Sequence, residues 1–291
     1  MTRIRTYRSI DRERTRPSGW ARWLYIVLVL AACIVTLWTV LVSVWQGIGG
    51  IHVAAAAAGW LLWSLLVGWL FSLTQRRHEP VGVGWRTAGY VWGLLPALLL
   101  AGLVNSWLTH LVPESATQFT AAIVAPIPEE SAKWLGVLLL VLMAPRVFHN
   151  RLSILLGGLF VGLGFAAMEN WRKTFDALSL APPEAKPAAM LQWFVTRGLV
   201  DNPIAHLAFT VTTALGIVSW LYHRDRDPIR RVLVVIGFGL LGCLLHFVNN
   251  FLAAIGVGFT ILYGLLMIAL VIGLLLWARR RDRMDGAIAP A

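Results

Sequence analysis

Ionisable side chains occur inside segments of this chain that are otherwise apolar. The stretch APIPEESAKW, residues 125–134, carries Glu129, Glu130 and Lys133 within a run that is apolar from Thr120 to Ala144. In a lipid bilayer each such charge costs several kcal/mol unless it meets a partner or water. Buried carboxylates can act as general bases or as metal ligands, and an ammonium group can balance their charge. The stretch therefore predicts a functional site.

Three later apolar runs contain polar residues of the same kinds. They hold Glu169 and Asn170 in the first, Arg197, Asp201, Asn202 and His206 in the second, and His246, Asn249 and Asn250 in the third. In the second run, Arg197 and Asp201 are four residues apart and are expected to form an ion pair.

Helical spacing predicts which of these residues share a face. Glu129 and Lys133 are four residues apart and share one, whereas Glu130 is turned about 100° away. His246 and Asn250 share a face in the same way. Each of these helices therefore presents a narrow polar seam.

The composition is typical of a membrane protein. Of the 291 residues, 58% are hydrophobic and 13% are charged, whereas soluble domains average about 45–50% apolar and about 25% charged residues. The net charge of +11 could suggest nucleic-acid binding. However, the basic residues lie in short segments between apolar runs, where the positive-inside rule places them. We therefore expect the lipid bilayer, and no nucleic acid, as the surroundings of this chain.

Eight apolar runs are long enough to cross a bilayer core of about 30 Å as helices. They lie near residues 22–46, 51–74, 87–111, 117–144, 152–172, 191–222, 232–254 and 257–277. The predicted fold is all-α, a polytopic bundle of about eight transmembrane helices. Most connections are short, which makes consecutive helices antiparallel neighbours, and the longer connection 173–190 is expected to be a mobile loop or a short interfacial helix.

The distribution of basic residues predicts the orientation. Twenty Lys and Arg residues fall on the side of the N-terminus and four on the other side, so both termini are expected to be cytoplasmic. We predict a basic cytoplasmic tail over residues 1–21 and a single transmembrane domain over 22–277, with a catalytic core at about 117–254. A second cytoplasmic tail is predicted over 278–291.

The polar residues of the four helices fall at overlapping depths. With a rise of about 1.5 Å per residue, Glu129 lies roughly 18 Å and His246 roughly 12 Å from the outer ends of their helices, and Glu169 lies close to an outer end. Each residue alone has a simpler interpretation. Glu129 and Lys133 could form a structural ion pair, although this leaves Glu130 unpaired, and a lone histidine is more often a packing residue. The convergence of four helices nevertheless favours a site.

At these residues the sequence resembles the PrsW family of polytopic intramembrane proteases, distant relatives of the glutamate-type CAAX prenyl endopeptidases. The resemblance is carried by Glu129, Glu130 and Lys133 in an E-E-x-x-K pattern, by Phe165, Glu169 and Asn170 in an F-x-x-x-E-N pattern, by His206, and by His246 and Asn250 in an H-x-x-x-N pattern. It spans roughly residues 120–255. Asn249 competes with Asn250 for the last position.

The resemblance implies a protease of the bacterial plasma membrane. It implies that Glu129 or Glu130 is the general base, that Glu169 and His206 complete the surroundings of the attacking water, and that His246 and Asn250 donate hydrogen bonds to the oxyanion. Lys133 would balance charge, and Asn170 and Asn249 would support the site. The implied substrate is a single-pass membrane protein such as an anti-sigma factor.

Alternatives remain at this point. Two histidines and a carboxylate also form a catalytic zinc ligand set, so Glu169, His206 and His246 could hold a divalent metal such as zinc, although the H-E-x-x-H motif is absent. A metal-free glutamate mechanism and a metalloprotease mechanism meet the requirements of amide hydrolysis equally well. A proton-coupled transporter and a non-catalytic membrane scaffold are the alternatives from other classes. A transporter would often show an inverted repeat and broken helices, and neither is clear in the sequence.

Overall fold

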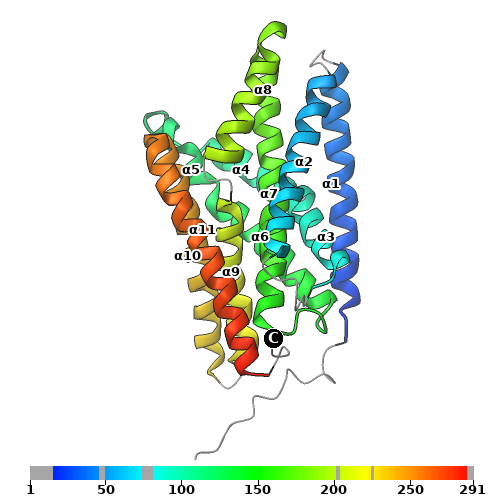
Figure 1. Ribbon diagram of the computed structural model, residues 1–291, viewed down its shortest axis with the longest axis vertical. Helices are drawn as coiled ribbons and strands as arrows, with labels where there is room; N and C mark the ends of the chain where they lie inside the picture. Colours follow the sequence, from blue (N-terminus) through cyan, green and yellow to red (C-terminus); the bar gives the residue numbers. More distant parts are fainter. Residues whose placement is uncertain (1–15, 46–49, 74–80, 201–203, 224–225, 287–291) are drawn as a thin grey trace, which may run out of the picture.

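The computed structural model describes residues 16–45, 50–73, 81–200, 204–223 and 226–286, and all regular secondary structure in these ranges is helical (Figure 1). The α-helices are α1 Gly19–Trp45, α2 Gly50–Leu73, α3 Val83–Trp92, α4 Leu98–Thr109, α5 Thr120–Val124, α6 Pro126–Met143, α7 Arg151–Leu180, α8 Lys186–Val195, α9 Ala205–Tyr222, α10 Pro228–Ile255 and α11 Val257–Met284. Short π or 3-10 segments are η1 Gly93–Ala97, η2 Glu114–Phe119, η3 Pro183–Ala185 and η4 Thr196–Val200. A helix satisfies its backbone polar groups internally, as an apolar chain in lipid requires.

Seven helices among the described residues are long and apolar enough to cross a membrane: α1, α2, the continuous α3–η1–α4 unit, α7, α9, α10 and α11. The predicted all-α polytopic bundle is confirmed, but the fourth predicted span, residues 117–144, differs from the prediction. It begins as η2 and the short α5, and it continues as α6 with 18 residues. The three charged residues in this short helix lower its hydropathy, so its place in the bundle depends on packing with other helices.

The predicted span 191–222 is interrupted in the structure. The helix α8 leads into the π-helical turn η4, and α9 begins at Ala205, directly before His206. Residues 173–190 were expected to be a mobile loop or a short interfacial helix. They are mostly helical, because α7 continues to Leu180 and is followed by η3 and α8. Irregular backbone at membrane depth is tolerated where it is buried in protein or lines a hydrated cavity. The interruption therefore fits the neighbourhood of a site.

The helix α7 lies at the centre of the bundle (Figure 1), and 83% of its apolar 18-residue stretch is buried, compared with 6% of the corresponding stretch of α1. Glycines allow its neighbours to approach closely. A Cβ atom at Gly164 would lie 1.9 Å from the carbonyl oxygen of Tyr90 on α3, and one at Gly162 would lie 2.6 Å from the carbonyl oxygen of His206 on α9. Small residues permit such backbone contacts between membrane helices. The helix α7 thus sets the position of α9.

The C-terminal helix α11 packs its last turns against the start of α7. Asp282 is fully buried and accepts hydrogen bonds from the backbone N–H of Leu152 at 2.8 Å and from the guanidinium of Arg151 at 3.0 Å. A carboxylate at a helix N-terminus satisfies N–H groups that lack partners within the helix. The predicted tail 278–291 is therefore helical as far as Met284. Its last residues, 287–291, and residues 1–15 of the predicted N-terminal tail lie outside the described residues.

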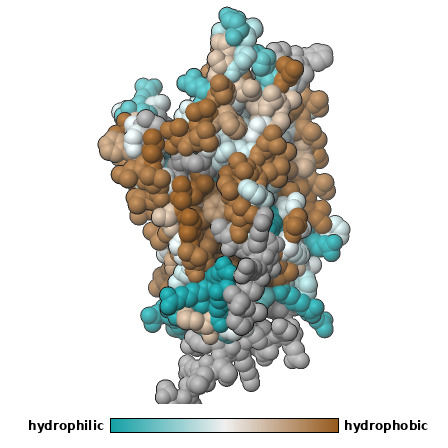
Figure 2. Space-filling model, viewed as in Figure 1, coloured by the Kyte–Doolittle hydropathy of each residue, from teal (hydrophilic) through white to brown (hydrophobic). Residues whose placement is uncertain are grey.

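The surface carries a hydrophobic belt. Figure 2 shows apolar residues over the middle of one face and hydrophilic residues toward both ends. Large apolar side chains are exposed along the outer helices, such as Trp38 on α1 at 68% and Leu262 on α11 at 62%. Such a belt matches the hydrocarbon core of a bilayer, and the protein is a multi-pass integral membrane protein. The helix α1 begins, and α11 ends, at the same end of the bundle (Figure 1). The cytoplasmic location of that end stays a prediction.

Candidate active site

The glutamate pair lies at the start of α6, directly after a break in the helix. Pro126 opens α6, and Pro128 follows it in the first turn. Neither proline can donate a backbone hydrogen bond, and proline is favoured in the first turn of a helix, so a new helix begins here. Glu129, Glu130 and Lys133 are 6%, 1% and 0% exposed. Three ionisable groups are thus held together away from lipid.

Lys133 connects α6 to α9. Its Nζ donates a hydrogen bond to Glu130 Oε1 at 2.5 Å and lies 3.0 Å from Nδ1 of His206. It also lies 4.4 Å from the centroid of the Phe165 ring, a favourable cation–π arrangement. The shared face of Glu129 and Lys133 suggested that these two would pair, but Lys133 turns to Glu130 instead. A spacing of three residues also places two side chains on one helix face.

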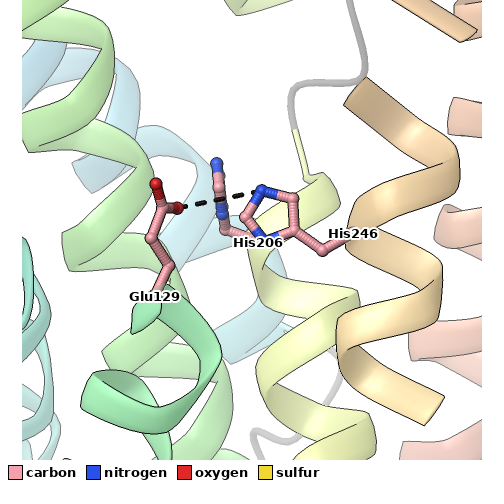
Figure 3. Close-up of side chains that lie close together, drawn as sticks. All are labelled: Glu129, His206 and His246. Atoms are coloured by element: carbon pink, nitrogen blue, oxygen red, sulfur yellow. Dashed lines mark ion pairs between the residues drawn. The ribbon is translucent and has the colours of Figure 1, made fainter. Parts of the chain in front are cut away.

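His246, on α10, lies between the two glutamates. Its Nδ1 is 2.9 Å from Glu130 Oε1, and its Nε2 is 3.8 Å from Glu129 Oε2 (Figure 3). An ionised carboxylate can only accept a hydrogen bond, so in the neutral imidazole Nδ1 carries the proton and Nε2 has the lone pair. The separation of 3.8 Å is too long for a hydrogen bond. Glu129 Oε2 is buried and has no hydrogen-bond partner among the described residues.

Glu169, on α7, orients His206. Its Oε2 lies 2.7 Å from His206 Nε2 and 3.2 Å from a terminal guanidinium nitrogen of Arg197. Its Oε1 lies 3.0 Å from Lys173 Nζ. Both oxygens of Glu169 are therefore occupied. Because α7 continues to Leu180, Glu169 lies about 16 Å from the end of its helix, farther from that end than the sequence indicated.

Figure 3 shows Glu129, His206 and His246 close together, and one ligand atom from each lies within 4.8 Å of the others. This set differs in one member from the predicted metal set, which had Glu169 in place of Glu129. The reason is that Lys173 and the Arg197 guanidinium hold the Glu169 carboxylate.

These residues fit a divalent metal. Glu129 Oε2 and His246 Nε2 are a buried carboxyl oxygen and a buried ring nitrogen that face each other without a partner between them, and both are atoms that can ligate a cation. His206 can offer a ring nitrogen if it gives up its contact with either Lys133 or Glu169.

The three predicted amide residues lie at different distances from this cluster. Asn170 is buried, and its Oδ1 accepts a hydrogen bond from Arg197 Nε at 3.0 Å. Asn249 is 6% exposed and donates from Nδ2 to Asn250 Oδ1 at 3.3 Å. Asn250 is less buried, and its Nδ2 donates to the carbonyl oxygen of Ala121 on α5 at 3.1 Å. Asn250 thus ties α10 to α5.

Two contacts of the site were not predicted from the sequence. Asn105, on α4, donates from Nδ2 to Glu129 Oε1 at 3.2 Å. The signal that could have found it is a single amide in the apolar run LLLAGLVNSWL. Arg197 binds Glu169 and Asn170. Its predicted partner Asp201 and the neighbouring Asn202 lie outside the described residues.

Comparisons with known proteins identify the family of the chain. Residues 80–276, which contain all the site residues named above, match a family model described as PrsW family intramembrane metalloprotease. The chain is 28% identical over 167 residues to Protease PrsW of Clostridioides difficile (strain 630). This match covers 57% of the present chain and 63% of that relative, slightly less than two thirds of its length. No solved structure matches the chain. Since the family model covers more than half of its residues, the chain belongs to the PrsW family of intramembrane metalloproteases.

Proposed function

We propose that the protein hydrolyses a peptide bond in or near the transmembrane segment of a membrane protein, using a metal held by Glu129, His206 and His246. The observation that carries this proposal is the pair of atoms Glu129 Oε2 and His246 Nε2, which lie 3.8 Å apart. Glu129 Oε2 is buried and has no described partner. Family membership favours this function over a transporter or a scaffold.

The side chains divide into three roles. A divalent metal such as zinc, when bound, supplies a Lewis acid that polarises the peptide carbonyl and the attacking water. Glu130 holds the tautomer of His246 through Oε1, as a carboxylate behind a ligating histidine does. Its Oε2 is the second buried carboxylate oxygen without a described partner, and it accepts the proton of the attacking water.

The remaining side chains orient and balance this group. Glu169 holds His206, and Lys133 compensates the charge of Glu130. Asn249 and Asn250 are the candidate donors to the oxyanion, because each primary amide has two N–H groups; Asn249 Nδ2 also donates to Asn250 Oδ1, and Asn250 Nδ2 donates to the carbonyl oxygen of Ala121 on α5. Asn170 fixes Arg197, which in turn holds Glu169.

The surroundings of the site favour a membrane protein as substrate. The active centre lies within a bundle that has a hydrophobic belt (Figure 2), so a substrate reaches it most directly from the plane of the membrane. We propose a single-pass membrane protein of the anti-sigma-factor type as substrate. We further propose the bacterial plasma membrane as the location, since the named relative is bacterial.

A metal-free glutamate mechanism is the second candidate. The observation that favours it is that both ring nitrogens of His206 already have partners, Lys133 at Nδ1 and Glu169 at Nε2. In that mechanism Glu129 Oε2 is the base, because it is the unpartnered oxygen beside His246. The two mechanisms differ in one measurable property, which is cleavage in the presence of a strong chelator.

The test uses the full-length protein purified in detergent, with metal analysis and cleavage of a membrane-spanning peptide. We expect bound metal in the wild type and loss of cleavage with chelator. Glu129→Gln should lose both metal and activity. Glu130→Gln should keep metal at saturating concentration but lose about 10²–10⁴-fold in rate, because Gln cannot take up the proton.

Glu184→Gln, in the exposed η3 turn, is the matched control and should behave as the wild type. Cleavage that persists in chelator supports the metal-free mechanism. Wild-type cleavage by both Glu129→Gln and Glu130→Gln would overturn the protease assignment of these residues.

A further inference from the structure

We infer that Asn105, on the lipid-facing helix α4, is a positioning residue that determines which oxygen of Glu129 faces the two histidines. The inference rests on the proposed function, because it concerns the carboxylate assigned there as a metal ligand. Asn105 lies outside every motif by which the sequence resembles its family.

The two oxygens of Glu129 have different partners. Oε1 accepts a hydrogen bond from Asn105 Nδ2 at 3.2 Å, whereas Oε2 has no described partner and lies 3.8 Å from His246 Nε2. A carboxylate is planar and rigid, so a bond that anchors one oxygen also directs the other. Because Oε1 accepts a hydrogen bond from a neutral donor, only Oε2 of Glu129 is available to bind a cation. Partners of this kind commonly orient metal ligands.

The position of Asn105 on α4 supports a specific role. Leu103 and Trp107, two residues away on either side, are 63% and 64% exposed, so much of this helix faces lipid. A primary amide in such a helix costs free energy unless its polar groups find partners. The nearby hydroxyls of Ser106 and Thr109 bond to carbonyl oxygens of their own helix. The Asn105 amide instead reaches across to α6 and its glutamate.

Because of its amide oxygen, a substitution at Asn105 can distinguish a structural role of this residue from a positioning role. Asn105 Oδ1 is buried without a hydrogen-bond partner among the described residues, and an unsatisfied acceptor lowers stability. Asn105→Leu keeps the shape of the side chain and removes this acceptor together with the donor. Removal of the unsatisfied acceptor offsets part of the cost of leaving Glu129 Oε1 without its donor, so the variant should still fold while Glu129 loses the bond that orients it.

The experiment measures zinc affinity of the purified, metal-depleted full-length protein by competition with a chromophoric chelator, together with cleavage at limiting and saturating zinc. We expect Asn105→Leu to bind zinc about 10–100-fold more weakly, the usual effect of losing a partner that orients a metal ligand. Its cleavage rate should fall more at limiting than at saturating zinc. Ser106→Ala, on the same helix, is the matched control and should leave both quantities unchanged.

Unfolding in detergent is measured alongside, and Asn105→Ala replaces the Leu variant if the latter does not fold. Wild-type zinc affinity in a folded Asn105 variant would overturn the inference and leave the proposed function intact. A wild-type protein that binds no zinc and cleaves without metal would contradict the metal-dependent function itself. The two failures are therefore distinguishable.

Discussion

Lys133 is the cation around which the buried charges of the site are arranged. It is fully buried, donates to Glu130 and contacts His206. Removal of one partner from a buried ion pair leaves an uncompensated charge, which costs far more than the pair contributes by its presence. The stability of α6 within the bundle therefore depends on this side chain.

Lys133→Met should lower the free energy of unfolding by about 3–5 kcal/mol, because Glu130 then remains buried without its cation. Addition of Glu130→Gln should recover much of this loss, since the double variant leaves no unpaired charge. The measurement is a denaturant titration in mixed micelles. Lys173→Met is the matched control, because Lys173 is 38% exposed and its ion pair with Glu169 should contribute no more than about 1 kcal/mol. Equal effects of the two Lys→Met substitutions would show that Lys133 is not the central cation.

The sequence predicted which ionisable residues gather, because a charge in an apolar run must find a partner. The structure indeed brings Glu129, Glu130, Glu169, His206 and His246 together. The sequence could not predict which glutamate pairs with Lys133, since Glu129 and Glu130 both lie within one turn of it and the side-chain rotamer decides between them. Asn105 was missed for a related reason, because a lone amide in a membrane helix can bond to any neighbour.

At the scale of helices, long uniform apolar runs were predictable and interruptions were not. The predicted spans 22–46, 51–74, 232–254 and 257–277 correspond to α1, α2, α10 and α11 within a few residues, except that α11 extends to Met284. The break between α5 and α6 occurs at Pro126, inside a predicted span. The length of an apolar run is set by the thickness of the bilayer and can be read from the sequence, whereas a break in a helix depends on contacts with other helices.

The crossing of α7 with α9 offers a test of how an element positions the site. A Cβ atom at Gly162 would lie 2.6 Å from His206 O and 2.9 Å from Leu207 Cα, so the backbone of α9 must move. We expect Gly162→Ala to cost about 1–3 kcal/mol in stability through overpacking. The displaced His206 should lower the cleavage rate about 100-fold. The measurements are peptide cleavage and unfolding in detergent.

Gly239→Ala on α10 is the control for the same substitution, because a Cβ atom there would meet nothing within 4 Å. It should leave cleavage unchanged. Wild-type activity of Gly162→Ala would mean that the close approach of α7 and α9 is not needed to place His206.

The whole molecule has two polar ends and an apolar middle, and its topology makes the two ends unequal. Figure 1 shows α1 beginning, and α11 ending, at one end, where α7 and α10 also begin. Arginines lie near the helix termini at that end: Arg22 near the start of α1, Arg151 and Arg230 at the starts of α7 and α10, and Arg279 in the last turns of α11. The helix α8 lies at the opposite end. The positive-inside rule therefore predicts that the arginine-rich end is cytoplasmic.

This orientation is tested with reporter fusions in cells. Fusions after Arg151 and Arg226 should report a cytoplasmic location, and a fusion after Ala185, between α7 and α8, should report an external one. The fusion after Ala185 is the most informative, because an external signal there means that α7 spans the bilayer from inside to outside.

The orientation also predicts where the substrate is cut. Along α7, Glu169 lies about 16 Å from the Leu180 end and about 27 Å from the Arg151 end. With that end outside, the site lies toward the external half of the bilayer, and cleavage should occur in the extracytoplasmic half of the substrate's transmembrane segment. An external signal at Arg226 would reverse the orientation and move the expected cut to the cytoplasmic half.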